Sequence, residues 1–319
     1  MPRSRSRRTR TGAPLPVRDG LNPSRIRVPG GPGAAPVTAG DLVAAAVAGQ
    51  RRRHPDDGPE AVAARFAAGE VVDATGRPLG PADLLRPGTD VWFHRIAAPE
   101  RRIAGPMPVL HADRLLVVVD KPHFLATTPR GAHVLESAVV RLRRELGEPD
   151  LVPAHRLDRL TAGVLLFVRD PAARGAYQGL FAGAGDVVKR YEALAPAPAA
   201  APPRELVTRQ DKTRGILQAR TVPGEPNART IVEGVEPRDG GMALWRLRPL
   251  TGRTHQLRLH LHDLGCPIAG DPLYPDVVPE GAEDPARPLR LLCRELAFDD
   301  PIDGSRRVFR SLRPEAGGA

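Results

Sequence analysis

The sequence is poor in cysteine, and it has no long apolar run. Only two cysteines occur in 319 residues, which is too few for a disulfide framework, and no Cys-x-x-Cys spacing offers a structural zinc site. No run of about 18 apolar residues is long enough to cross a membrane, and the N-terminal arginines are not followed by the apolar core of a signal peptide. We therefore expect a cytoplasmic protein without a membrane anchor.

Motifs that bind nucleotides or metals are also missing. Neither Gly-x-x-x-x-Gly-Lys-[Ser/Thr] nor Gly-x-Gly-x-x-Gly occurs, so no nucleotide cofactor is indicated. His255, His260 and His262 could share a helix face, but there is no His-Glu-x-x-His pattern and no cluster of carboxylates or cysteines to complete a metal shell. Phosphate contact or packing is the favoured role of these histidines, and we expect no metal and no cofactor.

The charge is strongly one-sided. A net charge of +10 and a pI near 10.7 suit a polyanionic partner such as RNA, because cations that neutralise phosphates release counterions. A GC-rich coding sequence would give the same Arg-, Ala-, Gly- and Pro-rich composition. The basic residues are nearly all arginine, and the three lysines are Lys121, Lys189 and Lys212. A lysine that persists in such a background suggests a need for a compact ammonium group.

The chain divides into three expected parts. Residues 1–37 lack periodic apolar positions, which predicts a disordered Arg-rich tail. Residues 38–100 form a small N-terminal module, with helices expected near 42–47 and 61–66 and short strands near 69–73 and 90–95. This module is either a degenerate RNA-binding domain or a structural extension. Residues 108–315 alternate strand and helix patterns, which by periodicity alone indicate an α+β domain.

The most informative segment is Ala154–Gly163, which is followed by the apolar run 164–168. It places Asp158 between Arg156 and Arg159, at the start of an expected buried strand. Cations on both sides should keep this carboxylate ionised, and an oriented carboxylate can attack an electrophilic carbon. The alternatives are an Asp that caps a helix or one that forms a surface ion pair.

The segment resembles the His-Arg-Leu-Asp-x-x-Thr-Ser-Gly signature of the RluA-type pseudouridine synthases. Three further stretches match this family in the right order, namely Leu115–Pro122, Lys189–Ala193 and Pro249–His260, and the match continues through Leu264–Tyr274. Ala162 stands where the family usually has Ser, which loses a hydroxyl near the turn and leaves the carboxylate in place. The resemblance implies a pseudouridine synthase fold, with a mixed and mostly antiparallel sheet flanked by helices.

The resemblance also implies the site. Asp158 matches the catalytic Asp, Tyr191 the active-site Tyr that stacks on uracil, and Arg258 the basic residue that pairs with the catalytic Asp. Arg156 matches the Arg that helps to fill the space left when the target nucleotide is extruded. The further residues that we expect to contact RNA are Lys121, Lys189, Arg253 and His255. Without the motif, Tyr191 could be an aromatic residue of the core.

The expected function is an RNA pseudouridine synthase that acts on structured rRNA or tRNA without a cofactor. A metal-dependent nuclease would need two or three converging carboxylates, which these motifs lack. A catalytically silent RNA-binding protein is the other alternative, and the intact set of Asp158, Tyr191 and Arg258 argues against it. We also expect a monomer. The RNA and the uridine that it modifies are not encoded in these motifs.

Overall fold

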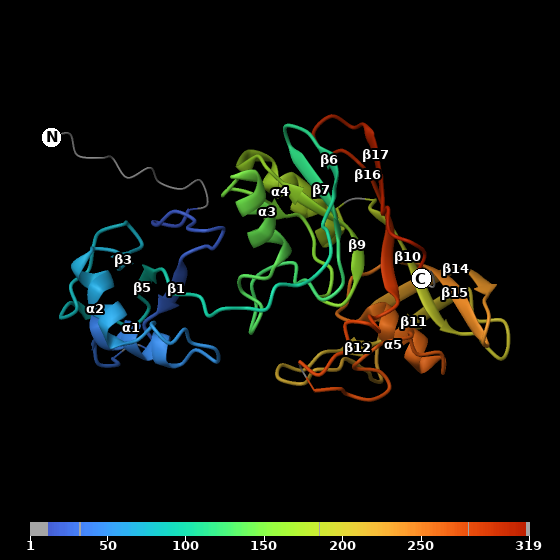
Figure 1. Cartoon of the computed structure of the whole chain (residues 1–319), viewed down its shortest axis with the longest axis horizontal. Coiled ribbons are helices and arrows are strands. Elements are labelled where there is room, and N and C mark those ends of the chain that lie inside the picture. Colours follow the sequence, from blue (N-terminus) through green and yellow to red (C-terminus); the bar gives the residue numbers. More distant parts are fainter. Residues whose placement is uncertain (1–11, 32, 185, 280, 317–319) are drawn as a thin grey trace. The chain divides into compact units, whose positions relative to one another are not determined.

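The computed structural model describes residues 12–31, 33–184, 186–279 and 281–316 of the chain (Figure 1). The chain forms two compact units. Unit 1 contains the residues up to Arg102 together with Thr128–Leu151, and unit 2 contains Ile103–Thr127 together with the residues from Val152 onward. Each unit has its own hydrophobic core.

Unit 1 combines a small sheet with two helices. Its elements are β1 (Ser24–Arg27), β2 (Val37–Thr38), α1 (Ala39–Ala48), α2 (Pro59–Ala67), β3 (Val72–Asp73), β4 (Leu84–Leu85), β5 (Asp90–Phe93) and α3 (Ala138–Leu146). The three-stranded sheet has the order β1-β5-β3, and β2 pairs with β4. The Thr38 hydroxyl begins α1 by accepting a hydrogen bond from the Asp41 amide, at 3.1 Å. The predicted helices and strands of this module are therefore present.

The N-terminal region is more ordered than its composition predicts. Residues 1–11 of the expected tail lie outside the described part of the chain. Within the rest, β1 pairs with β5 in antiparallel register, and Arg25 and Arg27 both bind the Asp90 carboxylate, at 2.6 and 2.9 Å. The prediction of disorder is wrong for this strand, because β5, which lies 63 to 69 residues further along the chain, supplies hydrogen bonds that local composition cannot reveal.

The boundary between the two units also differs from the prediction. The segment Thr128–Leu151 lies within the α+β domain predicted for residues 108–315, but it belongs to unit 1. Gly20, which has a φ of +75°, lies so close to α3 that an added Cβ would be 2.8 Å from the Val140 carbonyl oxygen. The Arg143 guanidinium on α3 donates a hydrogen bond of 2.9 Å to the Gly20 carbonyl. These contacts fix α3 to the N-terminal segment.

Unit 2 is built on a ten-stranded sheet. Its strands are β6 (Val109–Ala112), β7 (Leu116–Lys121), β8 (Val152–Pro153), β9 (Ala162–Val168), β10 (Val188–Pro196), β11 (Glu205–Thr208), β14 (Ala228–Pro237), β15 (Met242–Pro249), β16 (Leu291–Asp299) and β17 (Arg306–Arg310). The main order is β11-β14-β15-β10-β16-β9-β7-β6, with β17 beside β16 and β8 beside β9. Among the described strands of this sheet, β9 and β16 form the parallel pair and the other pairs are antiparallel. With helices α4 (Arg174–Gly179) and α5 (Gln256–Asp263), this confirms the predicted α+β class.

The parallel pair depends on Gly163. This residue has a φ of +111°, and a Cβ at this position would lie 2.2 Å from the Cys293 carbonyl oxygen. Only glycine permits the two backbones to approach so closely. Because Gly163 follows Asp158 by five residues, the same contact fixes where the Asp158 segment enters the sheet.

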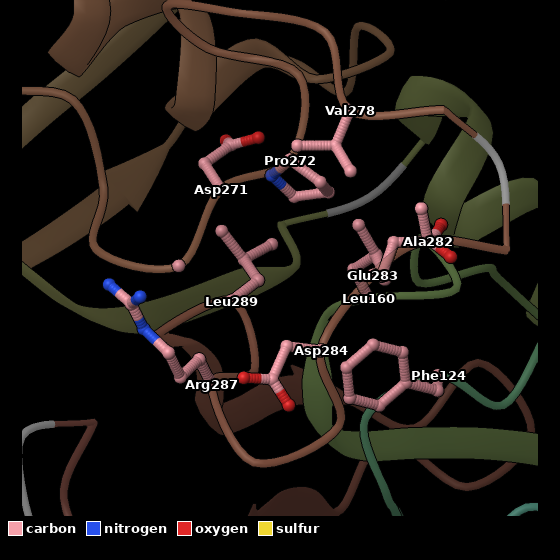
Figure 2. Close-up of a pocket in the computed structure, with 11 residues that line it drawn as sticks. Phe124, Leu160, Asp271, Pro272, Val278, Ala282, Glu283, Asp284, Arg287 and Leu289 are labelled. Atoms are coloured by element: carbon pink, nitrogen blue, oxygen red, sulfur yellow. The ribbon is translucent and has the colours of Figure 1, made fainter.

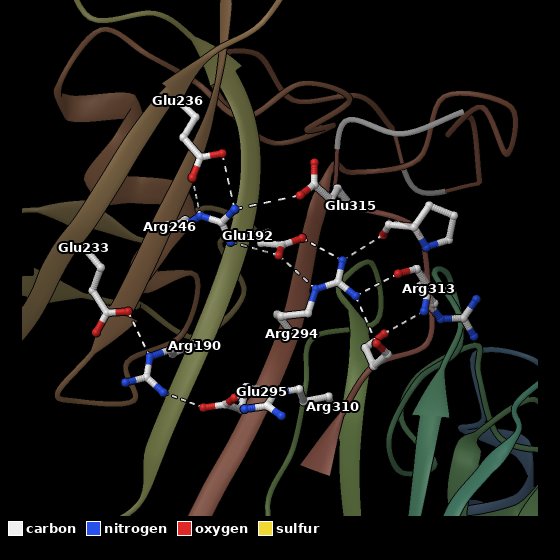
Figure 3. A network of polar contacts seen from close by, with 12 residues as sticks. Arg190, Glu192, Glu233, Glu236, Arg246, Arg294, Glu295, Arg310, Arg313 and Glu315 are labelled. Carbon is white, nitrogen blue, oxygen red and sulfur yellow. Dashed lines mark hydrogen bonds and ion pairs between the residues drawn. The ribbon is translucent and has the colours of Figure 1, made fainter. Parts of the chain in front are cut away.

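The two faces of β10 have different surroundings. Tyr191 and Ala193 lie against an apolar core that includes Leu257 of α5. Glu192, on the opposite face, accepts a hydrogen bond of 2.7 Å from Arg294 of β16. Figure 3 shows Glu192 and Arg294 within a chain of ion pairs that runs across neighbouring strands. Because successive side chains of a strand point to opposite faces of the sheet, the candidate site lies on the face of β10 that carries Tyr191.

Candidate active site

The turn that carries Asp158 is fastened to the protein through its backbone. The Leu157 amide donates to the Thr127 hydroxyl at 3.1 Å, and this hydroxyl donates to the Leu157 carbonyl at 2.8 Å. The Lys121 ammonium donates to the Arg159 carbonyl at 3.2 Å. The residues before and after Asp158 are therefore held from one neighbouring segment, 121–127. Such fixation positions a reactive side chain without using its own oxygen atoms.

His123 and the apolar core complete this fixation. Nδ1 of His123 donates to the Leu160 carbonyl at 2.7 Å, and burial lowers the pKa of His123 to about 4, so the ring is neutral. The Leu160 side chain is buried in the same core as Ala193 and Leu257. The turn is thus anchored by hydrogen bonds on one side and by hydrophobic packing on the other.

Lys121 is fully buried, with an exposed fraction of 0%. Its ammonium also donates to the carbonyls of Pro122 and Leu125, at 3.0 and 2.8 Å. Burial lowers the pKa of Lys121 to about 7, and the charge of Asp158 acts in the opposite direction. The prediction that Lys121 contacts RNA does not fit this burial. The side chain instead holds the turn of Asp158, because a buried ammonium needs several oxygen acceptors.

The end of the described chain is attached next to Lys121. The carboxylate of Asp120 is buried and accepts hydrogen bonds from the Ser311 hydroxyl at 2.9 Å and from the Leu312 amide at 2.8 Å. Arg313 adds a contact of 3.1 Å to the same carboxylate. This attachment fixes the strand that delivers Lys121 to the turn.

The Asp158 carboxylate itself has free oxygen atoms. The side chain is partly buried, and among the residues that the structure describes it accepts no hydrogen bond. Its charge nevertheless acts on the pKa values of Lys121, Tyr191, His255, Arg258 and Tyr274. Two cations, two aromatic hydroxyls and one imidazole are therefore close enough to feel a carboxylate that has no hydrogen-bond donor among the described residues, which suits a group that acts on a substrate.

Arg258 has a different partner from the predicted one. Its guanidinium forms a two-pronged contact with Asp271, with Nε–Oδ2 at 2.7 Å and Nη2–Oδ1 at 2.5 Å. Both side chains are almost completely buried, and a buried guanidinium needs an equally buried carboxylate. Burial alone would lower the pKa of Arg258, but the bonds to Asp271 raise it above its usual value. Arg258 therefore acts on Asp158 through its charge.

Tyr274 extends this cluster. Its ring lies 5.4 Å from the Arg258 guanidinium carbon, and its hydroxyl lies 3.3 Å from Nδ1 of His255. Burial raises the pKa of Tyr274 to about 12. Asp271 and Tyr274 belong to the last stretch that resembles the family, but their contacts with Arg258 could not be read from sequence.

Tyr191 lies on the site face of β10, at a bulge in its pairing with β16. It is opposite Cys293 of β16 and Leu247 of β15. Burial raises the pKa of Tyr191 well above its usual value, and the charge of Asp158 adds to this effect, so the phenol is neutral. The structure brings Tyr191, Asp158 and Arg258 into one electrostatically coupled group.

The remaining predicted RNA contacts have different degrees of exposure. Arg156 and Arg253 are exposed, while Lys189 and His255 are partly buried. Burial lowers the pKa of His255 to about 4, with a further contribution from the charge of Arg258. His255 has a φ of +60° and begins α5. Arg156 and Arg253 are therefore the better placed of these side chains for phosphate.

A cavity of about 300 Å³ lies beside the turn. Figure 2 shows that its walls come from Phe124, Leu160 and the loop that includes Asp271 and Arg287. Its remaining lining residues are Gly270, Pro272, Val278, Ala282, Glu283, Asp284 and Leu289. The cavity shares Leu160 with the Asp158 turn and Asp271 with the Arg258 pair, so it belongs to the same site.

The described residues contain neither a cluster that could hold a metal ion nor a helix that could span a membrane. Within the described ranges, no group of three or more His, Cys, Asp or Glu side chains is arranged to hold a metal ion. No helix in the described part of the chain has the length and apolar character of a membrane span.

Comparisons with known proteins identify the class. The sequence profile described as RNA pseudouridylate synthase matches residues 115–263. The dual-specificity RNA pseudouridine synthase RluA of Pasteurella multocida (strain Pm70) is 31% identical over 61% of this chain and 88% of its own length. The chain belongs to this family, the RluA-type RNA pseudouridine synthases.

Other relatives are longer than the matched region. The mitochondrial tRNA pseudouridine(32) synthase of Saccharomyces cerevisiae (strain ATCC 204508 / S288c) is 30% identical over 58% of this chain, but over only 41% of its own length. The chain thus spans less than half of that protein. A solved structure, human RNA pseudouridylate synthase domain containing 4, has 27% identity and a TM-score of 0.49, covering 65% of this chain and 88% of that one.

Proposed function

We propose that this chain isomerises uridine to pseudouridine in structured RNA, with Asp158 as the catalytic carboxylate. The observation that carries the proposal is the environment of Asp158. Its neighbours in the turn are held through their backbone, while its own oxygen atoms have no protein donor among the described residues. This combination leaves an oriented carboxylate available to the substrate.

The reaction exchanges two bonds within one nucleotide. The bond from N1 of uracil to C1′ of ribose breaks, the base turns, and a bond from C5 to C1′ forms. The proton on C5 leaves and N1 gains one, so atoms and electrons balance without an oxidant or a cofactor. Asp158 would stabilise or attack the electron-poor carbon, and the ring of Tyr191 would hold the detached base by stacking. Family membership and the coupled site support these roles.

The proposed substrate is an rRNA or a tRNA. Exposed Arg156 and Arg253 and the net charge of +10 support a polyanionic partner. The yeast relative is named for uridine 32 of tRNA, and that specificity belongs to the relative. For this chain, we propose that unit 1 contributes to the choice of RNA. The cytoplasmic location and the monomeric state stay predictions.

The substitution Asp158→Asn tests the proposal. It keeps the shape of the side chain and removes its charge, so pseudouridine formation should fall by about a thousandfold or more. RNA binding should persist, because affinity comes mainly from contacts between arginine and phosphate. The measurement is mapping of pseudouridine in unmodified rRNA and tRNA transcripts by a chemical derivatisation that is selective for the isomer, with filter binding alongside. Asp239→Asn, at an exposed carboxylate, is the matched control. Turnover within tenfold of wild type would refute the role of Asp158.

The same assay separates the alternatives. A metal-dependent nuclease would shorten the RNA and stop in excess chelator, while an isomerase leaves chain length and mass unchanged. A silent RNA-binding protein would retain RNA without forming pseudouridine. We expect pseudouridine at full RNA length with excess chelator present.

A further inference from the structure

A hairpin loop beside the site exposes two adjacent apolar side chains. Strands β12 (Gln210–Asp211) and β13 (Arg220–Thr221) pair in antiparallel register and project residues 212–219, here called the 212–219 loop. Ile216 is 40% exposed and Leu217 is 49% exposed. Single exposed apolar residues are common, so this pair needs a second observation before it indicates a contact surface.

The second observation is the charge around the pair. Four exposed cations lie in or next to the hairpin, namely Arg209, Lys212, Arg214 and Arg220, and the Lys212 ammonium donates to the Ile216 carbonyl. The only acidic residue from 209 to 221 is Asp211, and its carboxylate accepts a hydrogen bond of 3.0 Å from the Thr213 hydroxyl. Among the described residues, Arg214 has no carboxylate partner. Apolar side chains ringed by cations are complementary to bases flanked by phosphates.

The base of the loop is fixed to the catalytic cluster. The Ala219 amide donates to the Tyr274 hydroxyl at 2.8 Å, and this hydroxyl donates to the Ala219 carbonyl at 3.0 Å. Tyr274 in turn contacts Arg258 and His255. The Thr221 hydroxyl donates to Asp263, the last residue of α5, at 2.5 Å. Whatever the loop binds is therefore held at a set position relative to Asp158.

We propose that the 212–219 loop is a wedge for RNA, in which Ile216 and Leu217 pack against bases next to the target uridine while Arg214 and the adjacent Arg220 bind the flanking phosphates. The inference rests on the proposed function and adds the part of the protein that unstacks the bases next to the target nucleotide. Extruding a nucleotide costs a few kcal/mol of stacking, and an apolar side chain that enters the gap offsets part of this cost. The loop would thus favour uridines in structured RNA, where stacking must be broken.

A crosslinking experiment tests the position of the loop. The full chain with photoreactive benzoylphenylalanine in place of Leu217 is irradiated with a pool of unmodified tRNA and rRNA transcripts, and the crosslinked nucleotides are mapped together with pseudouridine. We expect crosslinks within a few nucleotides of the modified uridine. Crosslinks only to distant nucleotides, to a second copy of the chain, or to no RNA would overturn the proposal.

Substitutions test the energetics. The double variant Ile216→Ser with Leu217→Ser should weaken binding to folded transcripts about tenfold or more, and affect a denatured single-stranded oligonucleotide less. Ile302→Ser, at an apolar residue that is 51% exposed, is the matched control. All variants should melt at the wild-type temperature. If no transcript gains pseudouridine, the proposed function fails, and the proposal for the loop is then tested by the Kd for folded RNA alone. An unchanged Kd for the double variant on folded RNA overturns the wedge in either case.

Discussion

At the residue scale, two buried cations organise the site. Lys121 and Arg258 both lie in stretches that resemble family motifs, but the structure gives them partners other than the expected ones. Lys121 donates to backbone carbonyls, and Arg258 is bonded to Asp271. Each cation thereby places positive charge near Asp158 while its hydrogens are used elsewhere. The carboxylate of Asp158 is left open because its cationic neighbours are already bonded.

Replacing Arg258 by Lys should damage both stability and turnover. The two-pronged contact with Asp271 is lost although the charge is retained, so the free energy of unfolding should fall by about 2 kcal/mol. Pseudouridine formation should fall at least tenfold. Chemical denaturation and the transcript assay measure these effects. Arg306→Lys, at an exposed ion pair with Asp299, is the control and should change neither quantity. Wild-type stability in Arg258→Lys would contradict this account of the pair.

Lys121 predicts a pH dependence. Its pKa is lowered to about 7, so the ammonium is present below that pH and is lost as the pH rises through it. Deprotonation leaves two hydrogens for three carbonyl acceptors and removes a positive charge near Asp158, so kcat should decline above about pH 7. In Lys121→Met, kcat should be low at all pH values and should not decline further above about pH 7. The control Lys212→Met should show the same decline of kcat above about pH 7 as the wild type. A decline of the same shape in Lys121→Met would assign it to another group.

At the scale of elements, one glycine decides where the catalytic turn joins the sheet. The backbones of β9 and β16 approach each other at Gly163 and Cys293, directly after the turn. Tyr191 of β10 pairs with the same Cys293 from the other side. The close contact at Gly163 therefore sets the position of Asp158 relative to Tyr191.

Gly163→Ala should consequently be strongly destabilising. The new Cβ would meet the Cys293 backbone in a left-handed conformation, which together should cost about 3 kcal/mol or more. Thermal or chemical denaturation measures the loss. Gly175→Ala in α4 is the matched control, because no atom lies within 4 Å of a Cβ there. If the two variants were equally stable, the close approach would not be required.

At the scale of the molecule, chain order and structural units do not coincide. The segment Thr128–Leu151 interrupts unit 2 in the sequence and belongs structurally to unit 1. It begins directly after Thr127, which fastens the backbone next to Asp158. The segment that anchors the catalytic turn is therefore continuous with the unit proposed to choose the RNA.

Deleting residues 1–102 should destabilise α3. The deletion removes Gly20, which packs on Val140 and accepts a hydrogen bond from Arg143, so α3 should lose protection. Hydrogen exchange should be at least about tenfold faster in α3 of the truncated chain. Amides of β9 serve as the internal control and should keep their protection. Unchanged exchange in α3 would show that it folds without the N-terminal residues.

The sequence by itself determined the fold class and predicted the chemistry-bearing residues. Asp158 is marked by its flanking arginines, the strands by apolar runs, and the family by motifs in a fixed order, all of which are local patterns. It could not determine β1, the assignment of α3 to unit 1, the burial of Lys121 or the pairing of Arg258 with Asp271. Each of these depends on partners distant in sequence, whose burial and hydrogen bonding exist only after the chain has folded. Tertiary structure therefore decided how the site is held and added Asp271 and Tyr274 to it, while the sequence predicted Asp158, Tyr191 and Arg258 as its members.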